Sequence, residues 1–61
     1  KPVVIGNDVL IGAESIILKG VSIGNRSIIG AGSIVTCDIP SDEMWAGVPA
    51  RFIRKINQIS K

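Results

Sequence analysis

The chain repeats an apolar residue at every sixth position through most of its first forty residues. The leading positions are all Ile or Val, and Gly directly follows four of them. They are Ile5, Ile11, Ile17, Ile23, Ile29 and Val35. A period of six differs from the 3.6-residue period of a helix, but it is a multiple of the two-residue period of a strand. The pattern predicts short strands joined by turns, with three hexads making one coil of eighteen residues.

A second set of positions should also face the interior of the coil. The residue four places after each leading residue is small or β-branched: Val9, Ser15, Val21, Ser27, Ser33 and Ile39. We expect the Gly after a leading residue to adopt the corner backbone that a β-branched residue would resist. Position 41 should lead a seventh hexad, but it holds Ser41 after Pro40. The repeat is therefore predicted to stop at Pro40.

The residues after the repeat predict a turn, a short strand and a helix. Pro49 suits the first position of a helix, and Ile53 and Ile56 follow at helical spacing. This last segment is basic and has no acidic residue from Arg51 onward. We divide the chain into repeat coils at 1–40, a connecting loop with a short strand at 41–48, and a C-terminal basic helix at 49–61.

Composition supports strands and excludes several classes of function. Twelve Ile and six Val among 61 residues favour β-structure, because branched side chains suit a pleated surface. A net charge of +2 argues against a nucleic-acid-binding arm, and no apolar run approaches the roughly 18 residues of a membrane span. With no His and one Cys, these residues hold no His acid–base pair and no internal disulfide.

The chain also begins inside a hexad, at Lys1-Pro2-Val3, without an initiating Met. Six hexads make only two coils, and such repeats need several neighbours to bury their apolar face. We therefore expect Lys1 not to be a natural start and the chain to be the C-terminal part of a longer one.

The hexads, the segment IGAGSIVT and the segment AGVPARFIRKI together resemble the C-terminal half of hexapeptide-repeat acyltransferases. The resemblance is strongest to the sugar O-acetyltransferase branch, which includes maltose, galactoside and capsular-polysaccharide acetyltransferases, and it covers residues 2–59. It implies an all-β fold, a left-handed parallel β-helix with a short C-terminal α-helix, which is an exception to the usual right-handed crossover. It also implies a cytoplasmic homotrimer that binds acetyl-CoA in the groove between subunits and acetylates a saccharide hydroxyl.

The resemblance also implies roles for six residues. Ala13 and Ala31 match positions whose main chain faces the pantetheine arm, Thr36 and Cys37 match a Thr-Lys pair near the nucleotide, and Arg51 and Arg54 match cations that neutralise phosphates. Two departures stand out, because Leu10 occupies a position that often holds Trp, and Cys37 replaces the Lys. The family's general base is a His upstream of the matched segment, so no catalytic residue is expected here.

Other functions remain open from the sequence. The coils could serve only as a trimerisation or assembly module, and the missing His together with Cys37 favour that alternative. A metal-dependent hydratase on the same fold is a third candidate, although the basic segment after Pro49 argues against it. Ser15, Ser27 and Ser33 have no partner base and are interpreted as space-filling residues. The acceptor is also left open among a capsule sugar, a small sugar, serine and an antibiotic.

Overall fold

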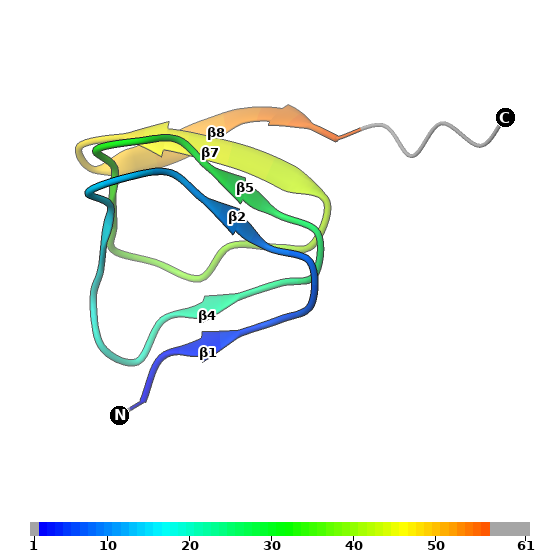
Figure 1. Cartoon of the computed structure of the whole chain (residues 1–61), viewed down its shortest axis with the longest axis horizontal. Coiled ribbons are helices and arrows are strands. Elements are labelled where there is room, and N and C mark those ends of the chain that lie inside the picture. The colour runs from blue at the N-terminus through cyan, green and yellow to red at the C-terminus, as the bar shows by residue number, and fades with distance from the viewer. Residues whose placement is uncertain (1, 57–61) are drawn as a thin grey trace, which may run out of the picture.

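The computed structural model describes residues 2–56, which form strands and turns without a helix (Figure 1). Six strands of two residues come first: β1 (Val4–Ile5), β2 (Leu10–Ile11), β3 (Ile16–Ile17), β4 (Ser22–Ile23), β5 (Ile28–Ile29) and β6 (Ile34–Val35). Two longer strands follow, β7 (Glu43–Gly47) and β8 (Ala50–Lys55). The expected all-β class is confirmed over this range. No described element is a helix that could cross a membrane.

The six short strands form three parallel pairs, each made of one strand and the strand three places later. β1 pairs with β4, β2 with β5 and β3 with β6. Val4 lies beside Ser22 and Ile16 beside Ile34, and the spacing of 18 residues matches that of the Asn7–Asn25 contact. The chain therefore winds into stacked three-sided coils (Figure 1), and the predicted coil length is confirmed.

The coil has three faces and three corners. The first face holds β1 and β4, the second holds β2, β5, β7 and β8, and the third holds β3 and β6. The first corner holds residues 7–8, 25–26 and 41–42, the second holds 13–14 and 31–32, and the third holds 19–20 and 36–38.

The middle coil forms the centre of the core. Ile23, Ile29 and Val35 are at most 2% exposed, and Ser27 and Ser33 are fully buried beside them. In the first coil Ile5 is 46% exposed, since no coil among residues 2–56 covers its outer side. The predicted inward direction of the leading residues, and of the residues four places after Ile23 and Ile29, is thus confirmed in the middle coil.

The prediction for the glycines was wrong in its physical cause. The left-handed backbone occurs instead at the second residue of each two-residue corner: Asp8, Glu14, Gly20, Arg26, Gly32 and Asp42. The glycines after the leading residues are needed because the next coil lies against them. A Cβ on Gly12 would lie 2.5 Å from Ala31 Cα, and one on Gly30 would lie 2.8 Å from Ala46 Cβ. Glycine permits the close approach that hydrogen bonding between coils requires.

The repeat does not stop at Pro40 as predicted, because it continues after a shortened corner. Ile39 pairs with Ile23 and Trp45 with Ile29, and this spacing of 16 residues matches that of the Asn25–Ser41 contact. Ile17 still pairs with Val35 at the longer spacing, so the missing two residues lie in the third corner. The chain thereby starts a third coil, with Ile39 in a leading position and only 2% exposed.

The predicted C-terminal helix is wrong over Ala50–Lys55, which forms β8. β8 runs antiparallel to β7 after the turn at Val48 and Pro49, whose peptide bond is cis. β7 would otherwise present a free strand edge, and pairing with β8 satisfies its backbone groups. The Phe52 ring meets the Trp45 ring edge-on at 6.3 Å between centroids. Residues 57–61 of the predicted helix lie outside the described residues.

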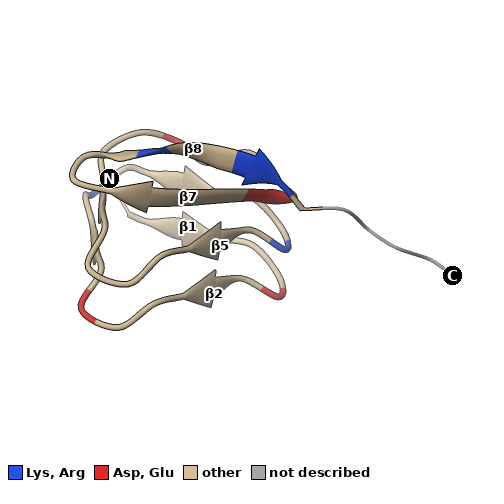
Figure 2. Ribbon diagram, turned by 90° about the horizontal axis from the view of Figure 1, so that it is seen from above, with Lys and Arg blue, Asp and Glu red and all other residues tan. Residues whose placement is uncertain are grey.

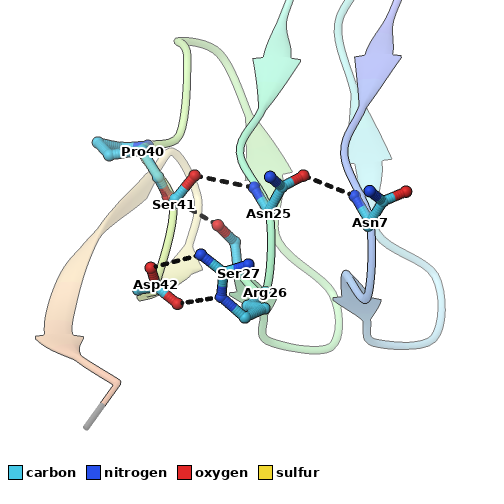
Figure 3. Close-up of polar contacts among 7 residues, drawn as sticks. All are labelled: Asn7, Asn25, Arg26, Ser27, Pro40, Ser41 and Asp42. Carbon is cyan, nitrogen blue, oxygen red and sulfur yellow. Dashed lines mark hydrogen bonds and ion pairs between the residues drawn. The ribbon is translucent and has the colours of Figure 1, made fainter. Parts of the chain in front are cut away.

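Side chains at the first corner link consecutive coils (Figure 3). The Asn7 backbone N–H donates to Asn25 Oδ1 at 2.8 Å, and the Asn25 N–H donates to Ser41 Oγ at 2.9 Å. Beside this ladder, Arg26 donates to both carboxylate oxygens of Asp42, at 2.7 and 3.0 Å. Side chains of each coil thus cap backbone donors of the coil before it, which fixes the stacking register.

Glu43, at the start of β7, joins β7 to β8. It is 9% exposed and accepts hydrogen bonds from Trp45 Nε1 at 2.9 Å and from Lys55 Nζ at 3.2 Å. The Trp45 hydrogen bond, followed by Lys55, lowers the pKa of Glu43 below its ordinary value near 4.5, although burial acts in the opposite direction. The carboxylate is therefore held in its ionised form.

The close approach at the second corner predicts a specific cost. Gly12→Ala should lower the free energy of unfolding by about 1–3 kcal/mol, because the new methyl group meets the Ala31 backbone. Gly32→Asn is the matched control at the same corner. A Cβ there meets open space, and Asn tolerates the left-handed backbone, so its loss should stay below about 1 kcal/mol. Urea unfolding of both variants measures the difference, and equal losses would contradict the steric explanation.

The lowered pKa of Glu43 predicts acid sensitivity. The unfolded chain binds the Glu43 proton more readily than the folded chain does, so this contribution to stability is complete above about pH 4.5. It is lost as the pH falls through the lowered pKa. Glu43→Gln should therefore flatten the decrease in the free energy of unfolding between about pH 5 and pH 3. Urea unfolding across this range checks it, and an unchanged slope would contradict it.

Candidate functional site

Ala13 and Ala31 lie one above the other at the second corner. The Gly32 N–H donates to the Ala13 carbonyl at 2.9 Å, and the Ala31 backbone lies directly against Gly12. Both alanines are exposed. Gly12 beside Ala13, and Gly30 and Gly32 beside Ala31, leave the main chain of this corner open to a ligand, as access to backbone donors and acceptors requires.

Thr36 and Cys37 lie at the third corner, where the coil is shortened. Both are exposed, and Cys37 is a free thiol. The third face, with β3 and β6, separates them from Ala13 and Ala31. The structure therefore places the predicted alanines and the Thr-Cys pair at opposite ends of one face.

Arg51 and Arg54 both lie on β8. Arg51 pairs with Ala46 and Arg54 with Met44, and the register shifts between Met44 and Trp45. Ala46 and Met44 are two residues apart on a strand and so point to the same side, and directly opposed residues share a side. The shift inserts Ile53 as an extra residue, so both arginines share the outer side of the second face.

Two rows of side chains on this outer side end at the arginines. One row is formed by Leu10, Ile28, Met44 and Arg54. Beside it, a second row holds Gly12, Gly30 and Ala46, which directly follow the paired residues Ile11, Ile29 and Trp45, and then Arg51, which lies opposite Ala46. The second row is flat, because its first three members carry at most a methyl group. The arrangement suits a ligand with an extended uncharged part and an anionic end.

The basic residues differ in what they already contact. Figure 2 shows that basic residues lie on β8 and at the corners. Arg26 pairs with Asp42, which raises its pKa, and Lys55 pairs with Glu43. Within residues 2–56, Arg51 makes no ion pair, and Arg54 donates only to the Lys55 carbonyl at 3.3 Å. Arg51 and Arg54 are exposed and thus remain open to an anion.

The other polar residues serve the fold. Ser15 Oγ and Ser33 Oγ donate to the Gly30 carbonyl at 3.1 and 2.6 Å, and Ser27 Oγ donates to the Pro40 carbonyl at 2.7 Å. These contacts support the interpretation that the serines fill internal space. Among residues 2–56 no group of three or more His, Cys, Asp or Glu side chains lies together as a metal site would require.

Sequence reasoning missed Glu43 and the shifted register of β8. Glu43 lies in the predicted connecting segment at 41–48, and its burial follows from the pairing of Trp45 with Ile29. One signal was present, because Ile39 and Trp45 keep the six-residue spacing after the shortened corner. That spacing places Glu43 at an inward position.

Comparisons with known proteins agree with this architecture. Residues 2–37 match the family described as the hexapeptide repeat of succinyl-transferase. The galactoside O-acetyltransferase of Escherichia coli K12 is 57% identical over 60 residues, covering 98% of this chain and 30% of that protein. A 2,3,4,5-tetrahydropyridine-2,6-dicarboxylate N-acetyltransferase of Halalkalibacterium halodurans is 56% identical over 61 residues, covering 100% and 25%.

A solved structure gives the same result in three dimensions. A galactoside acetyltransferase in complex with coenzyme A superposes with a TM-score of 0.90 at 59% identity, over 92% of this chain and 28% of that one. The chain thus spans about a quarter to a third of the length of these relatives. Because the matched hexads are the stacked coils described above and make up more than half of the chain, the chain belongs to the hexapeptide-repeat transferase family.

Proposed function

We propose that this chain is the acetyl-CoA-binding part of an acetyltransferase that transfers the acetyl group to a sugar hydroxyl. The observation that carries the proposal is the superposition on a galactoside acetyltransferase solved with coenzyme A. A His elsewhere in the protein would remove the proton of the hydroxyl, because these residues contain none. The acceptor oxygen would then bond to the acetyl carbon as the bond from that carbon to the coenzyme sulfur breaks.

Six residues of this chain would bind the coenzyme. The main chain at Ala13 and Ala31 would face the amide-bearing pantetheine arm. Arg51 and Arg54 would neutralise the phosphates, which is supported by their shared side of β8 and their lack of ion pairs within residues 2–56. Thr36 and Cys37 at the third corner would lie near the nucleotide. Cys37 supplies no positive charge there, so the arginines would carry more of the phosphate binding.

The coil would be a left-handed parallel β-helix that assembles as a homotrimer, with the coenzyme between subunits. Outward-facing apolar residues support this assembly. Leu10 on the second face is 63% exposed and Ile16 on the third face is 53% exposed, and both faces meet at the corner of Ala13 and Ala31. Packing another copy there would bury these side chains and form a groove along the alanines. We propose the cytoplasm as its compartment.

The phosphate role predicts losses in coenzyme affinity. In the full-length protein, Arg51→Ala and Arg54→Ala should each weaken coenzyme A binding about tenfold, the value of one charge-assisted hydrogen bond. Arg26→Gln is the matched control, because its guanidinium is already paired with Asp42. Isothermal titration with coenzyme A measures the three dissociation constants. Unchanged affinity in both β8 variants would remove the phosphate role, and no binding by the unmodified protein would favour a non-catalytic assembly module.

Transfer to an amine is a second candidate, favoured by the 56% identity to an N-acetyltransferase. The two candidates differ in the acceptor and share the coenzyme site. Assays of acetyl-CoA consumption with galactosides, maltose and amine-bearing dicarboxylates distinguish them. We expect turnover with a sugar hydroxyl, and turnover with amines alone would replace the first candidate by the second.

A further inference from the structure

Glu43 is a buried acid in a row that otherwise holds small or apolar residues. The register of β7 on β5 places it at the inward position that Ser27 occupies in the middle coil and Val9 in the first. It is 9% exposed. A carboxylate at such a position is costly unless its oxygens are hydrogen-bonded, so its partners define its role.

The two partners of Glu43 lie on either side of the irregularity in the β7–β8 pairing. Trp45 donates to Oε1 of Glu43 and pairs with Phe52, which directly precedes the extra residue Ile53 along β8. Lys55, which donates to Oε2, pairs with Glu43 after it. The carboxylate therefore contacts β8 directly at Lys55, and on the other side of the irregularity it holds the indole of Trp45, whose ring meets Phe52 of β8.

The irregular register decides where Arg54 points. If Ile53 paired with Met44 in a regular ladder, Arg54 would lie opposite Glu43 and face inward, because a shift of one residue reverses every side chain. Only the observed register keeps Arg54 on the outer side with Arg51. β8 lies at the edge of its sheet with one neighbouring strand, so its register depends on the pairing with β7, to which the Ile56 N–H adds a hydrogen bond to the Asp42 carbonyl at 2.8 Å.

We propose that Glu43, through Lys55 and Trp45, is a positioning residue that keeps Arg51 and Arg54 on one side of the sheet for a phosphate-bearing ligand. The inference rests on the proposed function, because it takes the ligand to be acetyl-CoA. Lys55 is the residue that prevents the alternative pairing. With a neutral residue at position 55, the Glu43 carboxylate would lack its cationic partner and would attract Arg54 into the register in which Arg54 lies opposite Glu43.

The test compares two acetyl donors in the full-length protein. Acetyl-CoA carries the nucleotide phosphates, whereas S-acetyl-pantetheine has the same thioester without them. Glu43→Gln and Lys55→Gln should raise the KM for acetyl-CoA about three- to tenfold, with kcat within about twofold. The KM for S-acetyl-pantetheine should stay unchanged. Lys55→Arg should keep the KM for acetyl-CoA, because the ion pair is conserved.

The matched control is Arg26→Gln, which breaks the ion pair with Asp42 at the first corner. It should alter thermal stability without changing the ratio of the two KM values. Equal increases in KM for both donors, or an unchanged KM for acetyl-CoA in Lys55→Gln, would overturn the positioning role of Glu43. Either result would leave the proposed phosphate-binding role of Arg51 and Arg54 unaffected. Unchanged coenzyme affinity in Arg51→Ala and Arg54→Ala would overturn the proposed phosphate site and the positioning role together.

Discussion

The close contact between the backbones of successive coils is the constraint on which the rest of this structure depends. A coil of two-residue strands has few hydrogen bonds of its own and gains the others only from the coil above or below. Gly12 and Gly30 allow that approach because a Cβ at either position would meet the next coil. The two-residue corners then repeat one backbone geometry, with a left-handed residue at the second position of each, whereas the shortened corner at 36–38 has none. The branched side chains fill the interior that this stacking creates.

The shortened third corner changes how the stack ends. By removing two residues it brings Ile39 and Trp45 over the middle coil, so that β7 adds to the second face and β8 pairs with its free edge. The hairpin thereby covers the coil with Trp45, Phe52 and the buried Ala50. An antiparallel strand satisfies the backbone groups that a further parallel coil would otherwise have used.

The candidate site combines parts that are held in place by different contacts. Ala13 and Ala31 are fixed by hydrogen bonds between coils, and their position follows directly from the repeat. Arg51 and Arg54 lie on the edge strand, where an extra residue interrupts the ladder. Their common orientation depends on one register, and Glu43 accepts hydrogen bonds from Lys55 on one side of the irregularity and from Trp45, the pairing partner of Phe52, on the other. The backbone part of the site is thus determined by the stacked coils, and the charged part by the pairing of a single hairpin.

The sequence alone determined the coil, because a six-residue apolar period can bury its leading residues only when strands of equivalent hexads stack. It also determined the stacking of Ala13 on Ala31, which follows from their eighteen-residue separation. Tertiary structure decided the conformation of Ala50–Lys55: Ile53 and Ile56 have helical spacing, yet the free edge of β7 makes this segment a strand. The spacing of apolar residues within a segment carries no information about a strand edge that another segment provides. The inward position of Glu43 and the shared side of Arg51 and Arg54 likewise depend on the partner strand, so they became visible only in the folded structure.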